Sequence, residues 1–176
     1  MRIRSTTIVG LRRDGRAAMG SDGQVTLGDV VMKQTARKVR KIHDGSILVG
    51  FAGSAADALT LVERFEGKLK EARGNLERAV TEMAKDWRSD RILRRLDALL
   101  GVMNLDHGYV VSGSGDVIEP DDGIVAIGAG GPIALAVCRA LLKHTQLPPD
   151  KIVNEAIAIT AGINIYTNLN ISVETL

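Results

Sequence analysis

Two threonines stand side by side near the start of the chain, in the stretch RSTTIVG at positions 4–10. Thr6 and Thr7 directly precede a short apolar run that is typical of a β-strand, and the basic leader MRIRS comes before them. A threonine hydroxyl is a poor nucleophile without a base, and one solution is an N-terminal threonine whose own α-amine takes the proton. The ordinary pKa of an α-amine is about 7.7–8.0, so the amine can act as a base near neutral pH.

Such a nucleophile has two requirements that the rest of the chain must meet. The leader has to be removed, and a lysine on an adjacent strand, held by a carboxylate, has to lie beside the threonine. Composition by itself supports a simpler interpretation, in which two β-branched residues begin a strand because they favour extended backbone. On these residues alone, both interpretations stay open.

Other candidate sites give weaker signals. The stretch GAGGP at 128–132 lies between a predicted strand and a predicted helix, but it lacks the spacing of phosphate-binding loops. A tight turn that needs glycine backbone freedom explains it better. The three histidines, His43, His107 and His144, are far apart and show no metal-ligand spacing.

Composition narrows the class of protein. The chain has 176 residues, a formal net charge of +2 and 3% aromatic residues, which fits one globular domain and argues against nucleic-acid binding. Its apolar runs are far shorter than the roughly 20 residues of a membrane helix, and the leader lacks a secretory signal, so we expect a cytoplasmic protein without membrane contact. The single cysteine, Cys138, is expected to be buried and structural.

The elements that would position the threonines form segregated blocks. Strands are predicted up to about residue 52, beginning with a hairpin that turns at Asp14-Gly15. Helical periodicity follows over 54–74 and 76–103, with a kink or a new helix start at Ser89-Asp90. The remainder is predicted as a hairpin around Ser114-Gly115, a strand in GIVAIG, helices at 132–144 and 149–162, and a last strand in ISVE. Blocks of this kind favour α+β layering, with helices outside antiparallel sheets.

Several longer blocks of sequence resemble one known family. They are TTIV, GSDGQVTLG at 20–28, ARKVRK, VGFAGSAADA, AKDWRSDRILRRL, AIGAGGP and IYTN. Together they resemble the HslV (ClpQ) family of bacterial proteasome-related peptidases over essentially the whole chain after Ser5. The resemblance implies a four-layer αββα N-terminal-nucleophile hydrolase with threonine endopeptidase activity. It further implies that residues 1–5 are a leader removed by self-cleavage and that residues 6–176 form a single peptidase domain.

The resemblance also implies roles for particular residues. Thr6 matches the nucleophile, and Lys38 matches a lysine whose charge lowers the pKa of the threonine amine and hydroxyl. Asp22 would hold that lysine, and the backbone N–H of Gly50 would stabilise the oxyanion of the tetrahedral intermediate. Ala129 stands where the family usually has serine, so one hydrogen bond beside the threonine amine is expected to be missing.

No organic cofactor is expected, but the family binds a cation through backbone carbonyls. The corresponding positions are Ala161, Asn164 and Thr167, and the implied ion is Na⁺ or Mg²⁺. Relatives more often carry Gly, Cys and Thr there, which leaves carbonyl ligands possible because every residue has one.

The family also implies an assembly. We expect a homo-dodecamer of two stacked hexameric rings that degrades unfolded polypeptides. An HslU-type AAA+ unfoldase hexamer would hydrolyse the ATP and activate the peptidase allosterically. Ring-to-ring packing and the partner-facing surface are predicted in the segment 54–103, including Arg91 and Arg94. The competing hypothesis is a catalytically inert, unprocessed structural subunit of a proteasome-like assembly.

Overall fold

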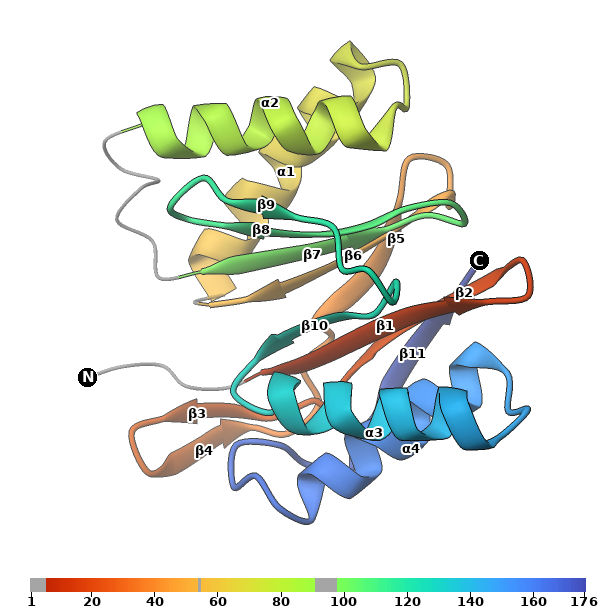
Figure 1. Cartoon of the computed structure of the whole chain (residues 1–176). Helices are drawn as coiled ribbons and strands as arrows, with labels where there is room; N and C mark the ends of the chain where they lie inside the picture. The colour runs from red at the N-terminus through yellow and green to blue at the C-terminus, as the bar shows by residue number, and fades with distance from the viewer. Residues whose placement is uncertain (1–5, 54, 91–97) are drawn as a thin grey trace.

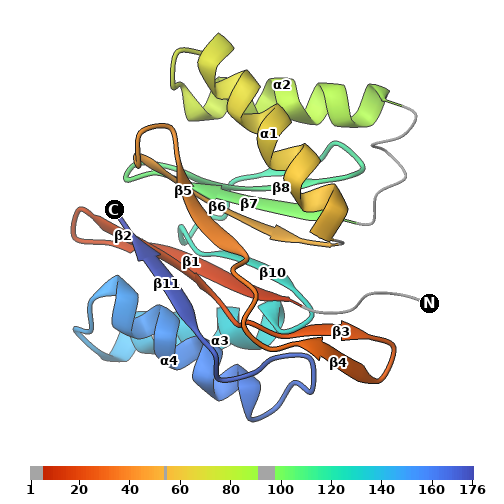
Figure 2. The same ribbon diagram turned by 180° about the vertical axis from the view of Figure 1, so that it is seen from behind.

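Two antiparallel sheets lie face to face, and each carries a pair of helices on its outer face (Figures 1 and 2). The structure, a computed structural model, describes residues 6–53, 55–90 and 98–176, with the backbone alone for 55–59. Helices α1 (Ala55–Glu71) and α2 (Leu76–Ser89) cover one sheet, and α3 (Gly131–His144) and α4 (Pro149–Ala161) cover the other. This αββα arrangement confirms the predicted fold class.

The first sheet contains the threonines. Its strands run in the order β10 (Val125–Gly128), β1 (Thr7–Arg13), β2 (Arg16–Ser21) and β11 (Ser172–Thr175). Asp14 and Gly15 connect β1 to β2 with φ angles of 53° and 72°, the left-handed backbone that a two-residue hairpin turn requires. The predicted hairpin is confirmed, and β1 lies in the interior of the sheet with a strand on each side.

The second sheet packs on the first through side chains and, at one point, through the backbone of a glycine. Its order is β5 (Val39–Ile42), β6 (Ile47–Ala52), β7 (Leu99–Met103), β8 (Gly108–Ser112) and β9 (Val117–Ile118), and Gly50 pairs with Gly101 at its centre. A Cβ at Gly50 would lie 2.8 Å from Ile8 Cγ2, which is closer than such atoms pack. Glycine at this position therefore allows the two sheets to approach.

Successive side chains of a strand point to opposite faces of its sheet, so each sheet contributes to two separate hydrophobic cores. On β6, Leu48 points to the other sheet and packs with Ile8 and Met19. Phe51 points the opposite way, into the core beneath α1 and α2 that contains the fully buried Trp87. Truncation of a buried aromatic residue of this kind to alanine costs about 3–5 kcal/mol. A further core lies between the first sheet and α3 and α4.

One prediction was wrong. The helical pattern predicted over 76–103 ends in α2 at Ser89, and Leu99–Met103 forms the strand β7 between β6 and β8. A short, continuous apolar run such as LLGVM is buried on both faces, so its spacing does not separate a strand from a helix. Arg91 and Arg94 lie outside the described residues.

The remaining elements agree with the predictions. The helices near 132–144 and 149–162 and the last strand are confirmed as α3, α4 and β11. A small separate hairpin, β3 (Val25–Leu27) and β4 (Val30–Lys33), projects beside the start of β1 (Figure 1). Within the described residues, the helices are too short or too polar to cross a membrane.

Candidate active site

Thr6 lies immediately before β1 and is almost completely buried, with 4% of its surface exposed. The end of β10 presses against it, because Gly128 is paired with Thr7 and has a φ of 88°. A Cβ at Gly128 would collide with the Thr6 carbonyl oxygen, and one at Gly130 would collide with the Thr7 hydroxyl. The glycines of GAGGP therefore serve the tight turn that the sequence predicted, and the turn forms one wall of the site.

Asp22 connects the threonines to the lysine. Its Oδ1 accepts hydrogen bonds from the Thr7 backbone N–H and from Lys38 Nζ, both at 2.9 Å. Its Oδ2 accepts from the backbone N–H groups of Gln24 at 2.8 Å and Asn168 at 3.4 Å. Because Asp22 is fully buried, these donors replace the water that its carboxylate has lost.

Lys38 precedes β5, and its side chain is only 8% exposed. Burial lowers the pKa of its ammonium, while the charge of Asp22 and the hydrogen bond to it act in the opposite direction. The ammonium also donates to the backbone carbonyl of Gln24, at 2.6 Å. The structure thus places Asp22 and Lys38 beside the backbone N–H of Thr7, the residue that follows Thr6.

Gly50 lies across the β5–β6 ladder from this lysine. The Phe51 N–H donates to the Lys38 carbonyl at 3.4 Å, so it points to the β5 side. Successive N–H groups on a strand point to opposite sides, and Gly50 N–H is therefore directed to β7. The role of Gly50 in stabilising an oxyanion stays a prediction, and its packing role against Ile8 is the one that the geometry displays.

A segment that the sequence did not single out as a unit closes the site. We call residues 162–171, between α4 and β11, the clasp. Within it, the Thr167 hydroxyl shares a hydrogen bond of 2.7 Å with the Thr7 hydroxyl. Asn168 accepts from Gly23 N–H at 3.1 Å and donates to the Gln34 carbonyl at 2.9 Å. The clasp therefore fixes both Thr7 and the segment that carries Asp22.

The three predicted cation positions lie at the end of α4 and in the clasp. Ala161 is the last residue of α4, and the Asn164 carbonyl accepts the Thr167 N–H at 3.0 Å. The side-chain Nδ2 of Asn164 is buried without a hydrogen-bond partner. Over the described ranges, no group of three or more His, Cys, Asp or Glu side chains could hold a metal ion.

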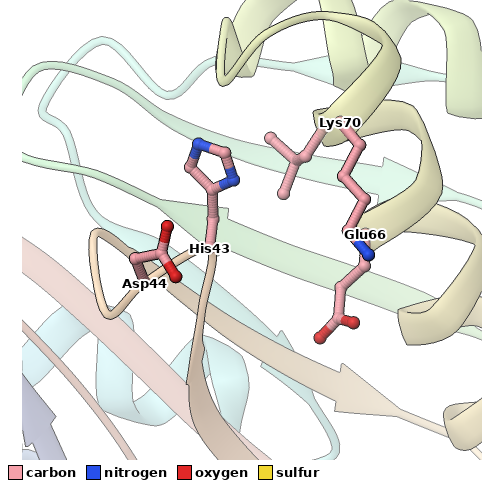
Figure 3. Close-up of a pocket in the computed structure, with 5 residues that line it drawn as sticks. His43, Asp44, Glu66 and Lys70 are labelled. Carbon is pink, nitrogen blue, oxygen red and sulfur yellow. The ribbon is translucent and has the colours of Figure 1, made fainter.

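A separate pocket of about 280 Å³ lies between the β5–β6 turn and α1 (Figure 3). Its lining is His43, Asp44, Glu66, Leu69 and Lys70, none of which is a predicted site residue. His43 and Asp44 have φ angles of 51° and 54°, which confirms that His43 belongs to a turn.

Ala129 lies between the last residue of β10 and the start of α3, in the turn beside Thr6. An alanine side chain carries no hydroxyl group. This turn therefore lacks the side-chain hydrogen bond that the hydroxyl of a serine at the same position could make.

The fold places the chain in a class of protein. Thiobacillus denitrificans BPH has the same fold, with a TM-score of 0.74 over 97% of both chains at 18% identity, and in its complex with epoxomicin the TM-score is 0.75 at 19% identity. At this identity the likeness concerns the fold alone, an αββα sandwich with helices outside two antiparallel sheets.

More similar proteins identify the family. Eukaryotic HslV from Trypanosoma brucei matches with a TM-score of 0.92 and 43% identity, covering 97% of this chain and 98% of that one. The ATP-dependent protease subunit HslV of Chlorobium luteolum is 55% identical over 172 residues, which cover 98% of this chain and 94% of that protein. The model of the family described as "Proteasome subunit" matches residues 3–176. The chain belongs to this proteasome subunit family, and it is a protease subunit of the threonine peptidase type.

Proposed function

We propose that Thr6 is the nucleophile of this peptidase and that cleavage of the Ser5–Thr6 bond makes it N-terminal. The observation that carries the proposal is the shared acceptor Asp22 Oδ1, which binds the Thr7 N–H and Lys38 Nζ at 2.9 Å each. Through this oxygen, two hydrogen bonds connect the positively charged ammonium of Lys38 to the backbone N–H of Thr7, which belongs to the peptide unit that follows Thr6. An acidic partner and a buried cation at the head of an interior strand are more than strand propensity requires.

The proposed reaction is peptide hydrolysis through an ester intermediate. The Thr6 hydroxyl oxygen attacks the substrate carbonyl while the free α-amine of Thr6 takes the hydroxyl proton. The amine then gives this proton to the departing substrate nitrogen, and water hydrolyses the ester to restore the threonine. Lys38 contributes its charge, which lowers the pKa of the amine and of the hydroxyl. Two of its three ammonium N–H groups bind Asp22 and Gln24, and the third can face the reacting group.

The oxyanion donor is proposed at Gly50 on the resemblance to the family. Ala129 leaves one side-chain hydrogen bond to the Thr6 amine unmade, which we expect to cost about 1 kcal/mol, or roughly fivefold in rate. Neither residue changes the identity of the nucleophile.

The test combines a substitution with an intact-mass measurement. Thr6→Ala should abolish hydrolysis of a fluorogenic peptide, because the variant keeps the fold and loses the attacking oxygen. Thr7→Ser is the matched control, because it keeps the hydroxyl that contacts Thr167, and its activity should stay within about threefold. The mass of the active chain should correspond to residues 6–176.

Two outcomes would contradict this proposal. Full activity of Thr6→Ala would show that another group is the nucleophile. A chain that keeps residues 1–5 and stays inactive with its unfoldase would favour the alternative, an unprocessed structural subunit.

The proposed assembly is a homo-dodecamer of two stacked hexameric rings, and an exposed apolar surface supports contact between copies. We call it the apolar patch, and it consists of Val30, Val31 and Met32 on β4 with Ile163, Ile165 and Leu169 in the clasp. The hydrogen bond from Asn168 Nδ2 to the Gln34 carbonyl ties its two halves together. Exposed apolar patches that join several elements commonly mark protein interfaces. The patch lies outside the segment 54–103 in which ring packing was predicted.

The proposed partner is an HslU-type AAA+ unfoldase hexamer that uses ATP, delivers unfolded polypeptides and activates the peptidase. The printed name of the Chlorobium luteolum relative, an ATP-dependent protease subunit, supports an energy-dependent system. The partner-facing surface remains proposed within 54–103, and the cytoplasm remains the predicted location.

A bound Na⁺ or Mg²⁺ is proposed at the carbonyls of Ala161, Asn164 and Thr167. Neutral oxygen ligands suit such hard cations, and a carbonyl oxygen has two lone pairs. The Asn164 carbonyl could therefore accept the Thr167 N–H and still bind an ion. A cation there would hold the first turns of the clasp in place.

A further inference from the structure

We propose that Gln24 is a positioning residue for Lys38, through which the clasp holds the ammonium in its working position. The inference rests on the proposed function of Lys38. It adds a residue that acts through the lysine and does not itself touch the substrate.

Gln24 is held through its backbone N–H and through its side-chain amide nitrogen. Its backbone N–H donates to Asp22 Oδ2 at 2.8 Å. Its side-chain Nε2 donates to Thr26 Oγ1 at 3.0 Å and to the carbonyl of Ile165 in the clasp at 2.9 Å. Only 7% of the residue is exposed, so these hydrogen bonds replace contacts with water. The result is a backbone carbonyl with little freedom to move.

That carbonyl is an acceptor for the buried lysine. Lys38 Nζ donates to Gln24 O at 2.6 Å and to Asp22 Oδ1 at 2.9 Å. A buried ammonium stays charged only while acceptors replace its hydration, and removal of one favours the neutral amine. Gln24 therefore affects both where the ammonium lies and how readily it keeps its proton.

The hydrogen bonds that lead from Lys38 through Gln24 end at a residue on the surface of the molecule. The backbone carbonyl of Ile165 accepts a hydrogen bond from Gln24 Nε2. The same residue is 78% exposed and belongs to the apolar patch. A contact that shifts the clasp would act on the lysine through the hydrogen bonds of one buried glutamine. Loss of those hydrogen bonds should uncouple the lysine without removing any group from the reaction.

The experiment compares two substitutions of Gln24 that have similar shapes but are expected to shift the pKa of Lys38 in opposite directions. Gln24→Met keeps the length of the side chain and removes the hydrogen bonds of Nε2 to Thr26 and Ile165, while the backbone contacts to Asp22 and Lys38 remain possible. We expect about a tenfold lower kcat, less than a twofold change in KM, and an alkaline limb of the kcat profile at lower pH. Gln24→Glu places a negative charge beside the lysine, which raises the pKa of Lys38 and moves the same limb to higher pH.

Gln34→Met is the matched control, because Gln34 is an exposed glutamine of the neighbouring segment whose backbone carbonyl makes the contact with Asn168. It should leave kcat and the pH profile unchanged. A role confined to stability would lower the melting temperature of both Gln24 variants without opposite shifts of the alkaline limb. Either that result or unchanged kinetics in both variants would overturn the inference.

Lys38→Ala separates this inference from the proposed function. If Lys38→Ala is inactive while the Gln24 variants resemble the control, only the role of Gln24 is wrong. If Lys38→Ala retains full activity, the role proposed for the lysine is itself wrong. Each measurement uses the assembled, processed enzyme with its unfoldase and a fluorogenic peptide.

Discussion

Lys38 is the residue at which burial and charge compete most directly. Burial lowers the pKa of its ammonium below the ordinary 10.5, although Asp22 opposes the shift. If the reaction needs the ammonium, activity must fall as the pH rises through this lowered pKa. In the proposed mechanism, activity also falls on the acidic side, because the Thr6 amine takes up a proton and stops acting as a base.

We therefore expect a bell-shaped dependence of kcat on pH, with the alkaline limb below pH 10.5. In Lys38→Arg the limb should move to higher pH because a guanidinium stays charged, while kcat falls because the planar group fits the site poorly. Stopped assays of peptide hydrolysis at each pH, with the unfoldase present, measure both effects. An alkaline limb at the same pH in the two proteins would contradict the assignment.

At the residue scale, the sequence singled out the candidate reacting residues but not the residues that support them. Thr6, Asp22 and Lys38 were predicted by their positions in blocks that resemble a family, and the structure joins Asp22 to Lys38 and to the N–H of Thr7. Gln24 and Asn168 were missed because their partners are 141 and 146 residues away in the chain. No periodicity or spacing reports hydrogen bonds between segments so far apart.

At the scale of elements, predictions succeeded where a local signal had a single structural meaning. Asp14-Gly15 specifies a two-residue hairpin, and the turn that follows β10 needs the backbone of Gly128. Leu99–Met103 failed because an apolar run that is buried on both faces fits either a strand or a helix. Only the pairing with β6 and β8 decides between them, and pairing is a property of the whole sheet.

Helix α3 gives a prediction for stability at high pH. Cys138 is buried in this helix, and desolvation raises the pKa of its thiol to about 12. Between pH 9 and 12 the unfolded chain loses this proton while the folded chain keeps it, so the free energy of unfolding decreases as the pH rises.

Urea denaturation at pH 8 and pH 10 checks this. The loss of stability between the two pH values should be smaller in Cys138→Ala, which has no thiol to titrate. The comparison uses the change with pH, because the alanine variant is less stable at both values owing to its cavity. An equal loss in the two proteins would show that the thiol does not take part.

At the scale of the whole molecule, the apolar patch gives a prediction for assembly. Met32 is 62% exposed on β4, and Ile118 is 55% exposed on β9, outside the patch. If copies meet at the patch, Met32→Lys loses apolar burial worth about 1.5–3 kcal/mol per contact, or more than a tenfold decrease in affinity.

Sedimentation velocity compares the two variants. Met32→Lys should shift the protein from the large assembly to smaller species, whereas Ile118→Lys should sediment like the unaltered protein. Equal sedimentation of both variants as the intact assembly would place the contact between copies elsewhere.

The contact between the two ends of the chain also has a consequence for the timing of the proposed maturation. Thr7 binds Thr167, and β11 completes the sheet of β1 by pairing with β2. At a synthesis rate of about 5–20 residues per second, the ribosome needs roughly 8–32 s to make the 160 residues that separate Thr7 from Thr167. During most of translation the nascent chain therefore contains Thr6 and Thr7 but not yet the clasp that contacts Thr7. If the proposed self-cleavage needs the clasp, it can occur only after translation, and an unfinished chain would not be able to digest its neighbours on the same polysome.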